Sequence, residues 1–166
     1  MGNVLVGDNS RSLLLVPRSG SHSIAASWLL QREPDNYAAW QANVNHHPAM
    51  YLASQDVRMA GERGGLGVIV RNPVERFRSM CARHTQKTVE DHLIVPQYGP
   101  MHSDGCSTFF RFEDELEAAA EWLGLSLPIL HLAAADDDNK PTLTPQQEAR
   151  VREIYAADIS LWESLQ

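Results

Sequence analysis

Two short stretches of the chain carry residue types that suit the binding of an anion. The first, "PRSGSHS" at residues 17–23, follows the apolar run "SLLLV". It forms the turn between a predicted buried strand and a predicted helix. A helix N-terminus presents backbone N–H groups and a partial positive charge, so such turns are typical of phosphate and sulfate sites. The residues that we predict to hold this anion are Arg18, Ser19, Gly20, Ser21, His22 and Ser23.

This turn is not a complete nucleotide-triphosphate loop. That loop has the pattern G-x-x-x-x-G-K-[ST], and the chain lacks its first glycine, its lysine and its metal-binding hydroxyl in that order. What remains is a shorter cradle of backbone N–H groups from residues 19–23, to which Arg18 adds a positive charge. Taken alone, the segment is equally well interpreted as an ordinary serine-rich turn.

The second stretch, "VRNPVERFRS", follows the apolar run "LGVIV" at residues 66–70. Pro73 suits the first position of a helix, with Asn72 as its cap. Arg71 then stands at the end of a strand and Ser79 about two turns into the helix. A bend at Asn72-Pro73 lets Arg71 and Ser79 approach the same anion.

Strands and helices alternate along the chain. Apolar runs predict buried strands at residues 12–16, 66–70 and 108–112, and helical spacing predicts a helix after each of them. A last helix, capped by Thr144, carries one apolar stripe as far as Leu165. This order predicts one α/β domain over residues 1–166, a three-layer sandwich with a short, mainly parallel sheet flanked by helices. In such folds ligands bind at the carboxyl ends of the strands, where both stretches begin.

The net charge of −7 argues against nonspecific nucleic-acid binding, which needs a broad basic face. Most of the basic residues are arginines, which suit bidentate contacts with phosphate or sulfate. Several crowd the middle of the chain: Arg58, Arg63, Arg71, Arg76, Arg78 and Arg83. They indicate a small anionic ligand, and the alternative is that they lie on solvated helix faces.

The chain shows no membrane-spanning stretch and no signal peptide, so we expect a soluble, cytoplasmic protein without a membrane partner. Two cysteines, Cys81 and Cys106, are too few for a disulfide framework. We therefore predict free thiols in a reducing compartment. No heptad repeat indicates a dimer, and the oligomeric state is not predicted.

Together the two stretches resemble the sulfotransferases that use 3′-phosphoadenosine 5′-phosphosulfate (PAPS). In that family a Pro-Lys/Arg-x-Gly-Ser/Thr-x-Ser turn holds the 5′-phosphosulfate, and residues 17–23 match it. An Arg-[Asp/Asn]-Pro-x-x-Arg-hydrophobic-x-Ser segment holds the 3′-phosphate through its arginine and serine, and residues 71–79 match every marked position. The tail, with "FFRFEDELEAAAEWLGL" and "LTPQQEARVREIYAADISLWESL", is similar to the carbohydrate-type branch.

The resemblance implies a P-loop-like fold and a nucleotide-binding transferase. PAPS is the implied donor, no metal is required, and the acceptor is a hydroxyl of a carbohydrate or similar polar small molecule. Arg18 takes the place of a frequent lysine and keeps the charge that the departing phosphate needs. His22 takes the place of a commoner serine or threonine, which removes one hydroxyl contact.

A base is needed because the acceptor hydroxyl must lose its proton as it attacks sulfur. The segment "NVNHHPAMYL" lies between the two motifs, where the resembling branch often has a histidine near the acceptor. Histidine has a suitable unperturbed pKa of about 6.5. His46 and His47 are the candidates, and the alternative is that both are ordinary loop residues.

Other polar residues admit several interpretations. Within the loop at residues 85–107, "HLIVPQY" resembles a segment that lines the acceptor cleft, and His84, His92 and His102 shape that site or lie in solvent. Zinc ligation by Cys81, His84, His102 and Cys106 matches no compact zinc module. Residues 136–138 are acidic and suit either a cation or a solvated loop. Arg76 and Arg78 support the site or lie in solvent.

Two other functions remain open. A small kinase on a related scaffold is disfavoured because the turn lacks the Lys-[Ser/Thr] pair and no magnesium-binding aspartate is evident. A non-catalytic adenosine-nucleotide-binding protein would bind the same nucleotide without transferring sulfate. The identity of the acceptor is not predicted.

Overall fold

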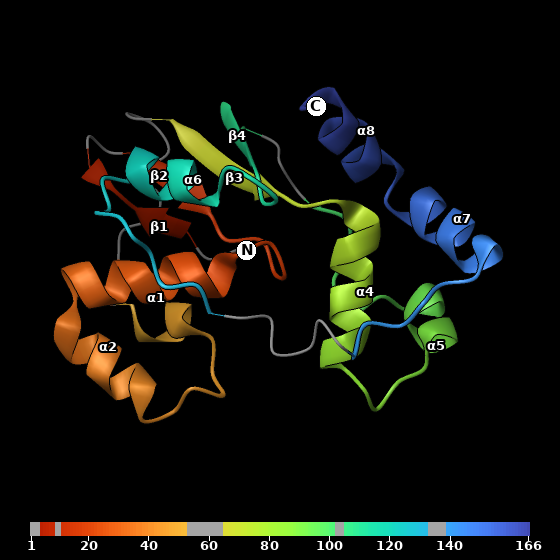
Figure 1. The fold of residues 1–166 in the computed structure, drawn as a ribbon, viewed down its shortest axis with the longest axis horizontal. Helices are drawn as coiled ribbons and strands as arrows, with labels where there is room; N and C mark the ends of the chain where they lie inside the picture. The colour runs from red at the N-terminus through yellow and green to blue at the C-terminus, as the bar shows by residue number, and fades with distance from the viewer. Residues whose placement is uncertain (1–3, 9–10, 53–64, 102–104, 133–138) are drawn as a thin grey trace. The chain divides into compact units, whose positions relative to one another are not determined.

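The computed structural model describes residues 4–8, 11–52, 65–101, 105–132 and 139–166 (Figure 1). The chain divides into two compact units. The first comprises Met1–Ile69 and Ser103–Leu132, and the second comprises Val70–His102 and Ala133–Gln166. The single domain over residues 1–166 stays a prediction.

A four-stranded mixed sheet is flanked by helices, which confirms the α/β class (Figure 1). The strands lie in the order β1 (Val4–Val6), β2 (Ser12–Leu14), β3 (Leu66–Val70) and β4 (Thr108–Arg111). β1 is antiparallel to β2, with Leu5 opposite Leu13, and β2 is parallel to β3, with Leu13 opposite Gly67. The sequence did not predict β1. It did predict β3 with its observed bounds, and β2 is shorter than predicted.

The first unit also contains α1 (Ser21–Arg32), α2 (Pro34–Gln41), the 3₁₀ helix η2 (Pro48–Tyr51) and α6 (Leu116–Trp122). α1 packs against both α2 and η2. The apolar residues Ile24 and Leu29 of α1 are fully buried in one core with Leu5 of β1, Leu13 of β2 and Leu123, which follows α6. Burial of a leucine or isoleucine side chain contributes about 1.5–3 kcal/mol. The core therefore fixes α1 and the turn that precedes it.

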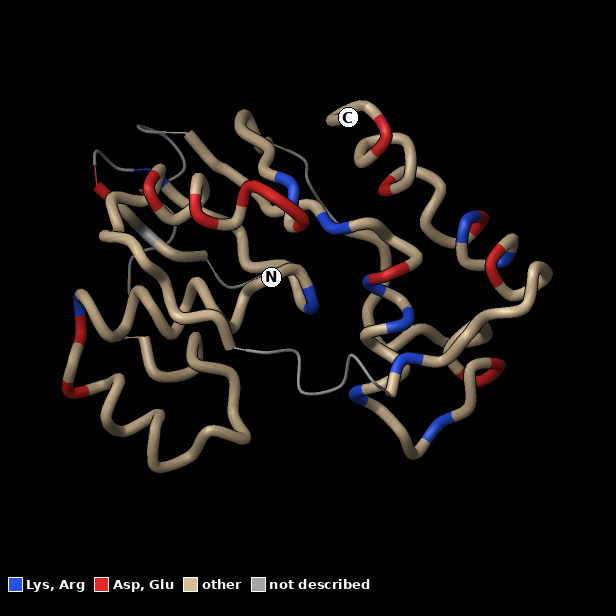
Figure 2. Tube along the Cα trace, viewed as in Figure 1, with Lys and Arg blue, Asp and Glu red and all other residues tan. Residues whose placement is uncertain are grey.

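The second unit contains α4 (Pro73–Arg83), α5 (Val89–Ile94), α7 (Pro145–Ile154) and α8 (Ala156–Ser164). α4 packs against α7 and α8, and α5 packs against α7. Phe77, Met80 and Val151 lie in its apolar core. Acidic and basic residues are interleaved along α7 (Figure 2), where Arg152 pairs with Glu148 at 3.2 Å.

The last predicted helix is two helices, because the chain breaks at Tyr155. Tyr155 has backbone angles φ −107° and ψ 30°, and its buried side chain donates a hydrogen bond to the carbonyl of Tyr98 at 2.6 Å. The predicted start of the last helix is confirmed, because Thr144 caps α7. The two cysteines, Cys81 and Cys106, are free thiols as predicted.

Within the described ranges, no helix has both the length and the apolar character that a membrane span requires.

The cap of α7 gives a test of the second unit's stability. Thr144 Oγ1 accepts from the N–H of Gln147 at 3.2 Å, and Gln147 Oε1 accepts from the N–H of Thr144 at 2.9 Å. We expect Thr144→Ala to lower the free energy of unfolding by about 1 kcal/mol, because the N–H of Gln147 loses its side-chain acceptor. Urea titration measures this. Thr142→Ala, at an exposed position just before the cap, is the control; an equal loss there contradicts the expectation.

Candidate functional site

The turn after β2 has an unusual backbone. The N–H of Ser19 donates to the carbonyl of Val16 at 3.2 Å, which closes a turn through Pro17 and Arg18. Arg18 has φ +65°, in the left-handed region. Proline at the second position and a positive φ at the third is the pattern of a type II turn, which normally places glycine there. An arginine in this conformation costs roughly 1–2 kcal/mol, and such strain concentrates at functional sites.

Gly20, at the start of α1, is required by the fold itself. It has φ +76°, and a Cβ added there would lie 2.6 Å from Leu116 Cδ1 and 3.2 Å from Phe112 Cδ2. Both the backbone conformation and this packing exclude a side chain. The sequence analysis included Gly20 among the residues that hold an anion, and the packing of this unit is by itself a sufficient reason for glycine at this position.

The first turn of α1 presents its backbone donors beyond Ser19. The N–H of Ile24 donates to the carbonyl of Gly20 at 3.1 Å, and the N–H groups of Ser21 and Ser23 lie in the turn before it. The N–H of Ser19 is already bonded to Val16, which shortens the predicted run of donors. The hydroxyl of Ser19 is 1% exposed and has no hydrogen-bond partner among the described residues. A buried hydroxyl left in this state costs about 1–3 kcal/mol, and a ligand oxygen would remove that cost.

Ser23 has a structural contact that the sequence did not reveal. Its Oγ accepts from the N–H of Leu132 at 3.1 Å, and Ser27 Oγ accepts from the N–H of Leu130 at 2.8 Å. Ser27 also donates to the carbonyl of Ser23 at 2.7 Å. These serines attach the segment after α6 to one side of α1, so the hydroxyl oxygen of Ser23 already serves the fold.

The structure brings His47 to the predicted anion turn. His47 Nε2 lies 3.0 Å from Ser21 Oγ, and the His22 and His47 rings have centroids 4.1 Å apart. His47 also caps η2, because its Nδ1 accepts from the N–H of Ala49 at 3.1 Å. The segment that supplies the predicted bases therefore lies directly against the first turn of α1.

His46 has different surroundings. Its ring is exposed, and Nδ1 lies 3.4 Å from the hydroxyl of Tyr51. Its backbone carbonyl accepts from Trp40 Nε1 at 3.0 Å, which ties the segment to α2. His46 is thus open to solvent, and His47 is partly enclosed next to it.

Burial lowers the pKa of His47 from 6.5 to about 4, and the nearby His22 ring adds to this effect. The fold thus favours the neutral ring. Between pH 6.5 and about 4 the unfolded state binds more protons at this residue than the folded state. Stability from this group is present above that window and is lost as the pH falls through it.

This linkage gives a pH test. We expect the wild type to lose stability relative to His47→Gln as the pH falls from 6.5 to 4. In this window the unfolded wild type gains a proton at His47 that the folded state does not bind, and the variant has no such group. At about 1.4 kcal/mol per pKa unit, the shift is at most about 3 kcal/mol. Urea unfolding across the window measures it. A difference that stays constant with pH would show that folding does not change the pKa of His47.

A scan against protein-family models and searches of curated proteins and of solved structures find no match to the chain. The resemblance to sulfotransferases therefore rests on the two motifs and stays a prediction.

The second motif lies in the second unit. Asn72 caps α4 as predicted, since its Oδ1 accepts from the N–H groups of Val74 at 3.0 Å and Glu75 at 3.3 Å. These two donors are thereby used within the unit. Arg71 is 9% exposed and directly follows β3, and Ser79 is fully buried in α4. A buried arginine and a buried hydroxyl on these elements are suitable ligands for an anion.

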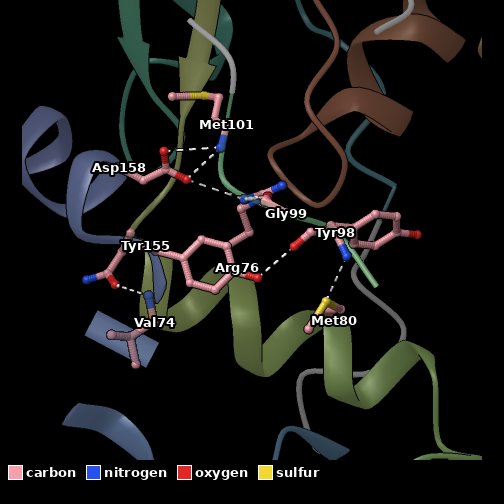
Figure 3. Close-up of polar contacts among 9 residues, drawn as sticks. Val74, Arg76, Met80, Tyr98, Gly99, Met101, Tyr155 and Asp158 are labelled. Atoms are coloured by element: carbon pink, nitrogen blue, oxygen red, sulfur yellow. Dashed lines mark hydrogen bonds and ion pairs between the residues drawn. The ribbon is translucent and has the colours of Figure 1, made fainter. Parts of the chain in front are cut away.

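Arg76 takes part in a buried ion pair (Figure 3). Its guanidinium lies 3.6 Å from Asp158 Oδ2, and both side chains are less than 10% exposed. It also donates to the carbonyl of Gly99 at 3.3 Å and lies over the Tyr155 ring. Burial lowers the pKa of Arg76, and Tyr155 and Asp158 oppose that shift. Arg76 therefore joins α4 to α8 and to the segment that contains Gly99.

The same cluster holds the irregular segment at residues 98–101 (Figure 3). Asp158 accepts from the N–H of Met101 through both carboxylate oxygens, at 2.9 and 3.1 Å. The N–H of Tyr98 contacts Met80 Sδ at 3.4 Å. The sequence analysis did not single out Asp158, although the tail segment quoted there contains it, three positions after Tyr155. Arg78 also has partners within the unit, since it pairs with Glu75 and donates to the carbonyl of Pro141.

Removal of one partner from this buried pair should be costly. We expect Asp158→Ala to lower the free energy of unfolding by about 3–5 kcal/mol, because the Arg76 charge and the Met101 N–H lose their acceptor. The double variant Arg76→Met/Asp158→Leu should lose less free energy of unfolding than the sum of the losses in Arg76→Met and in Asp158→Leu. Asp114→Ala, which breaks an exposed pair with Arg111, is the control and should cost less than about 1 kcal/mol. Equal losses from Asp158→Ala and Asp114→Ala would contradict this account.

The second unit also has a pocket of about 330 Å³. Its lining residues are Asn72, Val74, Glu75, Arg78, Thr142, Leu143, Glu148 and Arg152. The two arginines pair with the two glutamates of the same lining, so the charges of the pocket compensate one another.

The remaining candidates have varied surroundings. His84 Nε2 lies 3.3 Å from the Tyr98 hydroxyl, His92 is fully buried, and burial raises the pKa of Cys81 to about 11. Across the described ranges, no group of three or more His, Cys, Asp or Glu side chains is placed to hold a metal ion. Several predicted residues lie outside the described residues: Arg58, Arg63, His102 and residues 136–138.

Proposed function

We propose that the chain is a PAPS-dependent sulfotransferase with a three-layer, P-loop-like fold, which acts on a hydroxyl of a carbohydrate or similar polar acceptor. The observation that carries the proposal is the contact between His47 and Ser21 at 3.0 Å. It joins the segment predicted to supply the base to the turn predicted to hold the phosphosulfate. Twenty-six positions separate these two residues in the sequence.

The proposal assigns the 5′-phosphosulfate of PAPS to the turn of the first unit. Arg18 supplies positive charge, and the N–H groups of Ser21 and Ser23 supply donors. The buried hydroxyl of Ser19 supports this assignment, because it has no hydrogen-bond partner among the described residues. It is a polar atom that an anion oxygen would satisfy.

The 3′-phosphate is assigned to Arg71 and Ser79. Their motif matches the family pattern at every marked position, and both side chains are buried. Each of the two motifs follows a strand, and these strands, β2 and β3, are parallel neighbours. Ligands of α/β folds bind beyond the carboxyl ends of such strands, which is consistent with the assignment.

In the proposed reaction PAPS supplies the sulfuryl group. His46 or His47 accepts the proton of the acceptor hydroxyl as its oxygen bonds to sulfur, and the bond from sulfur to the phosphate oxygen breaks. Arg18 then faces the negative charge that collects on that phosphate. A guanidinium holds its proton at neutral pH, so Arg18 acts through charge and not as an acid.

Nucleotide binding tests the proposal. We expect 3′-phosphoadenosine 5′-phosphate (PAP) to bind at least about tenfold more tightly than adenosine 5′-monophosphate (AMP), because charge-assisted contacts are worth about 1.5–3 kcal/mol each. In Arg71→Ala and in the smaller change Ser79→Ala, PAP should lose most of this advantage while AMP binding persists. Isothermal titration calorimetry measures both.

Arg83→Ala, an exposed basic position at the end of the same helix, is the matched control. It should bind PAP as the wild type does. A preference for ATP, or no binding of any of these nucleotides, would reject the proposal. Conversion of PAPS to PAP in the presence of an oligosaccharide panel, followed by chromatography, separates a sulfotransferase from a protein that only binds the nucleotide.

A further inference from the structure

The hydrogen bonds of His47 determine which of its ring nitrogens carries the proton. The N–H of Ala49 points to Nδ1 at 3.1 Å. A backbone N–H is always a donor, so Nδ1 must act as an acceptor and carries no proton. This bond is also the cap of η2, so the fold of the segment maintains it.

A neutral imidazole with an unprotonated Nδ1 carries its proton on Nε2. Burial lowers the pKa of His47 to about 4, so the ring is neutral at physiological pH. Its Nε2–H therefore donates to Ser21 Oγ across the 3.0 Å contact. Both nitrogens are then occupied, and neither has a free lone pair with which to accept a proton from a substrate.

The direction of this hydrogen bond also decides the role of Ser21. In a serine nucleophile the histidine accepts the proton of the serine, whereas here the serine oxygen accepts from the histidine. The hydroxyl hydrogen of Ser21 thus remains available as a donor. Ser21 is the first residue of α1, so its hydroxyl lies at the N-terminal end of the helix.

We propose that His47 is a positioning residue: its Nε2–H fixes the Ser21 hydroxyl so that this hydroxyl donates to the anion bound at the first turn of α1. The inference rests on the proposed function, and it assigns the base to His46. The His46 ring is exposed, and it contacts the Tyr51 hydroxyl through Nδ1 at 3.4 Å, which leaves Nε2 to face an acceptor. The two adjacent histidines then have different tasks, one in anion binding and one in proton transfer.

Two substitutions separate the two hydrogen bonds of His47. In His47→Asn the side-chain oxygen replaces Nδ1 and keeps the cap of η2, while the donor to Ser21 is lost. In His47→Gln the longer amide reaches Ser21 with its NH₂ group, and the cap is lost. We expect PAP affinity to fall about tenfold in His47→Asn and to stay within about threefold of the wild type in His47→Gln.

Ser21→Ala should lose PAP affinity to the same extent as His47→Asn. The double variant should lose no more than either single variant, because both substitutions remove the same hydrogen bond between His47 and Ser21. His131→Gln changes an exposed histidine of the same unit and is the control. Unfolding curves establish that each variant is folded. Wild-type affinity in His47→Asn, or additive losses in the double variant, would overturn the proposal.

A second measurement does not depend on PAP. Long-range ¹H–¹⁵N spectra of the chain without nucleotide report the tautomer of His47, and we expect the proton on Nε2. Titration with inorganic sulfate, followed by the amide signals of residues 21–23, then tests the anion site of wild type and His47→Asn. If PAP does not bind but sulfate binds in a His47-dependent way, the sulfotransferase proposal is rejected and the role of His47 in anion binding is supported. A proton on Nδ1, or no response to either anion, overturns the role of His47.

Discussion

The parallel pairing of β2 with β3 is the constraint on which the first unit depends. Parallel neighbours need a crossover connection, and here the chain between the two strands includes α1, α2 and η2. The chain must therefore turn sharply after β2 so that α1 can pack its apolar residues on the core. That turn is the anion candidate, and the same crossover carries His47 back to the start of α1. The contact between motif and histidine thus follows from strand pairing.

Patterns that depend on neighbouring residues were predictable from the sequence. The continuous apolar run of β3 and the Asn-Pro start of α4 gave these elements with the right beginnings. The break at Tyr155 was not predictable, because the apolar stripe continues through it at helical spacing. At the break, Tyr155 donates a hydrogen bond to the carbonyl of Tyr98, 57 positions earlier in the chain, and no local pattern contains this contact. β1 was missed because its three residues are too few to show a period.

The candidate site shows the same division. Residue types and spacing identified the turn, but the tasks of its members depend on distant partners. Gly20 is set by Leu116 and Phe112, and Ser23 accepts from Leu132. No local pattern contains these contacts, since each partner comes from a segment about a hundred positions away. Sequence reasoning therefore identified the turn, and the contacts of its serines and histidines were visible only in the structure.

The two thiols of the chain differ in burial. Cys81 is buried in the second unit with a pKa raised to about 11, so it holds almost no thiolate at neutral pH. Cys106 is only half-buried and belongs to the first unit. A thiol reagent added to the folded chain at pH 7 therefore reacts slowly at Cys81, and the rate of that reaction reports on opening of the second unit's core.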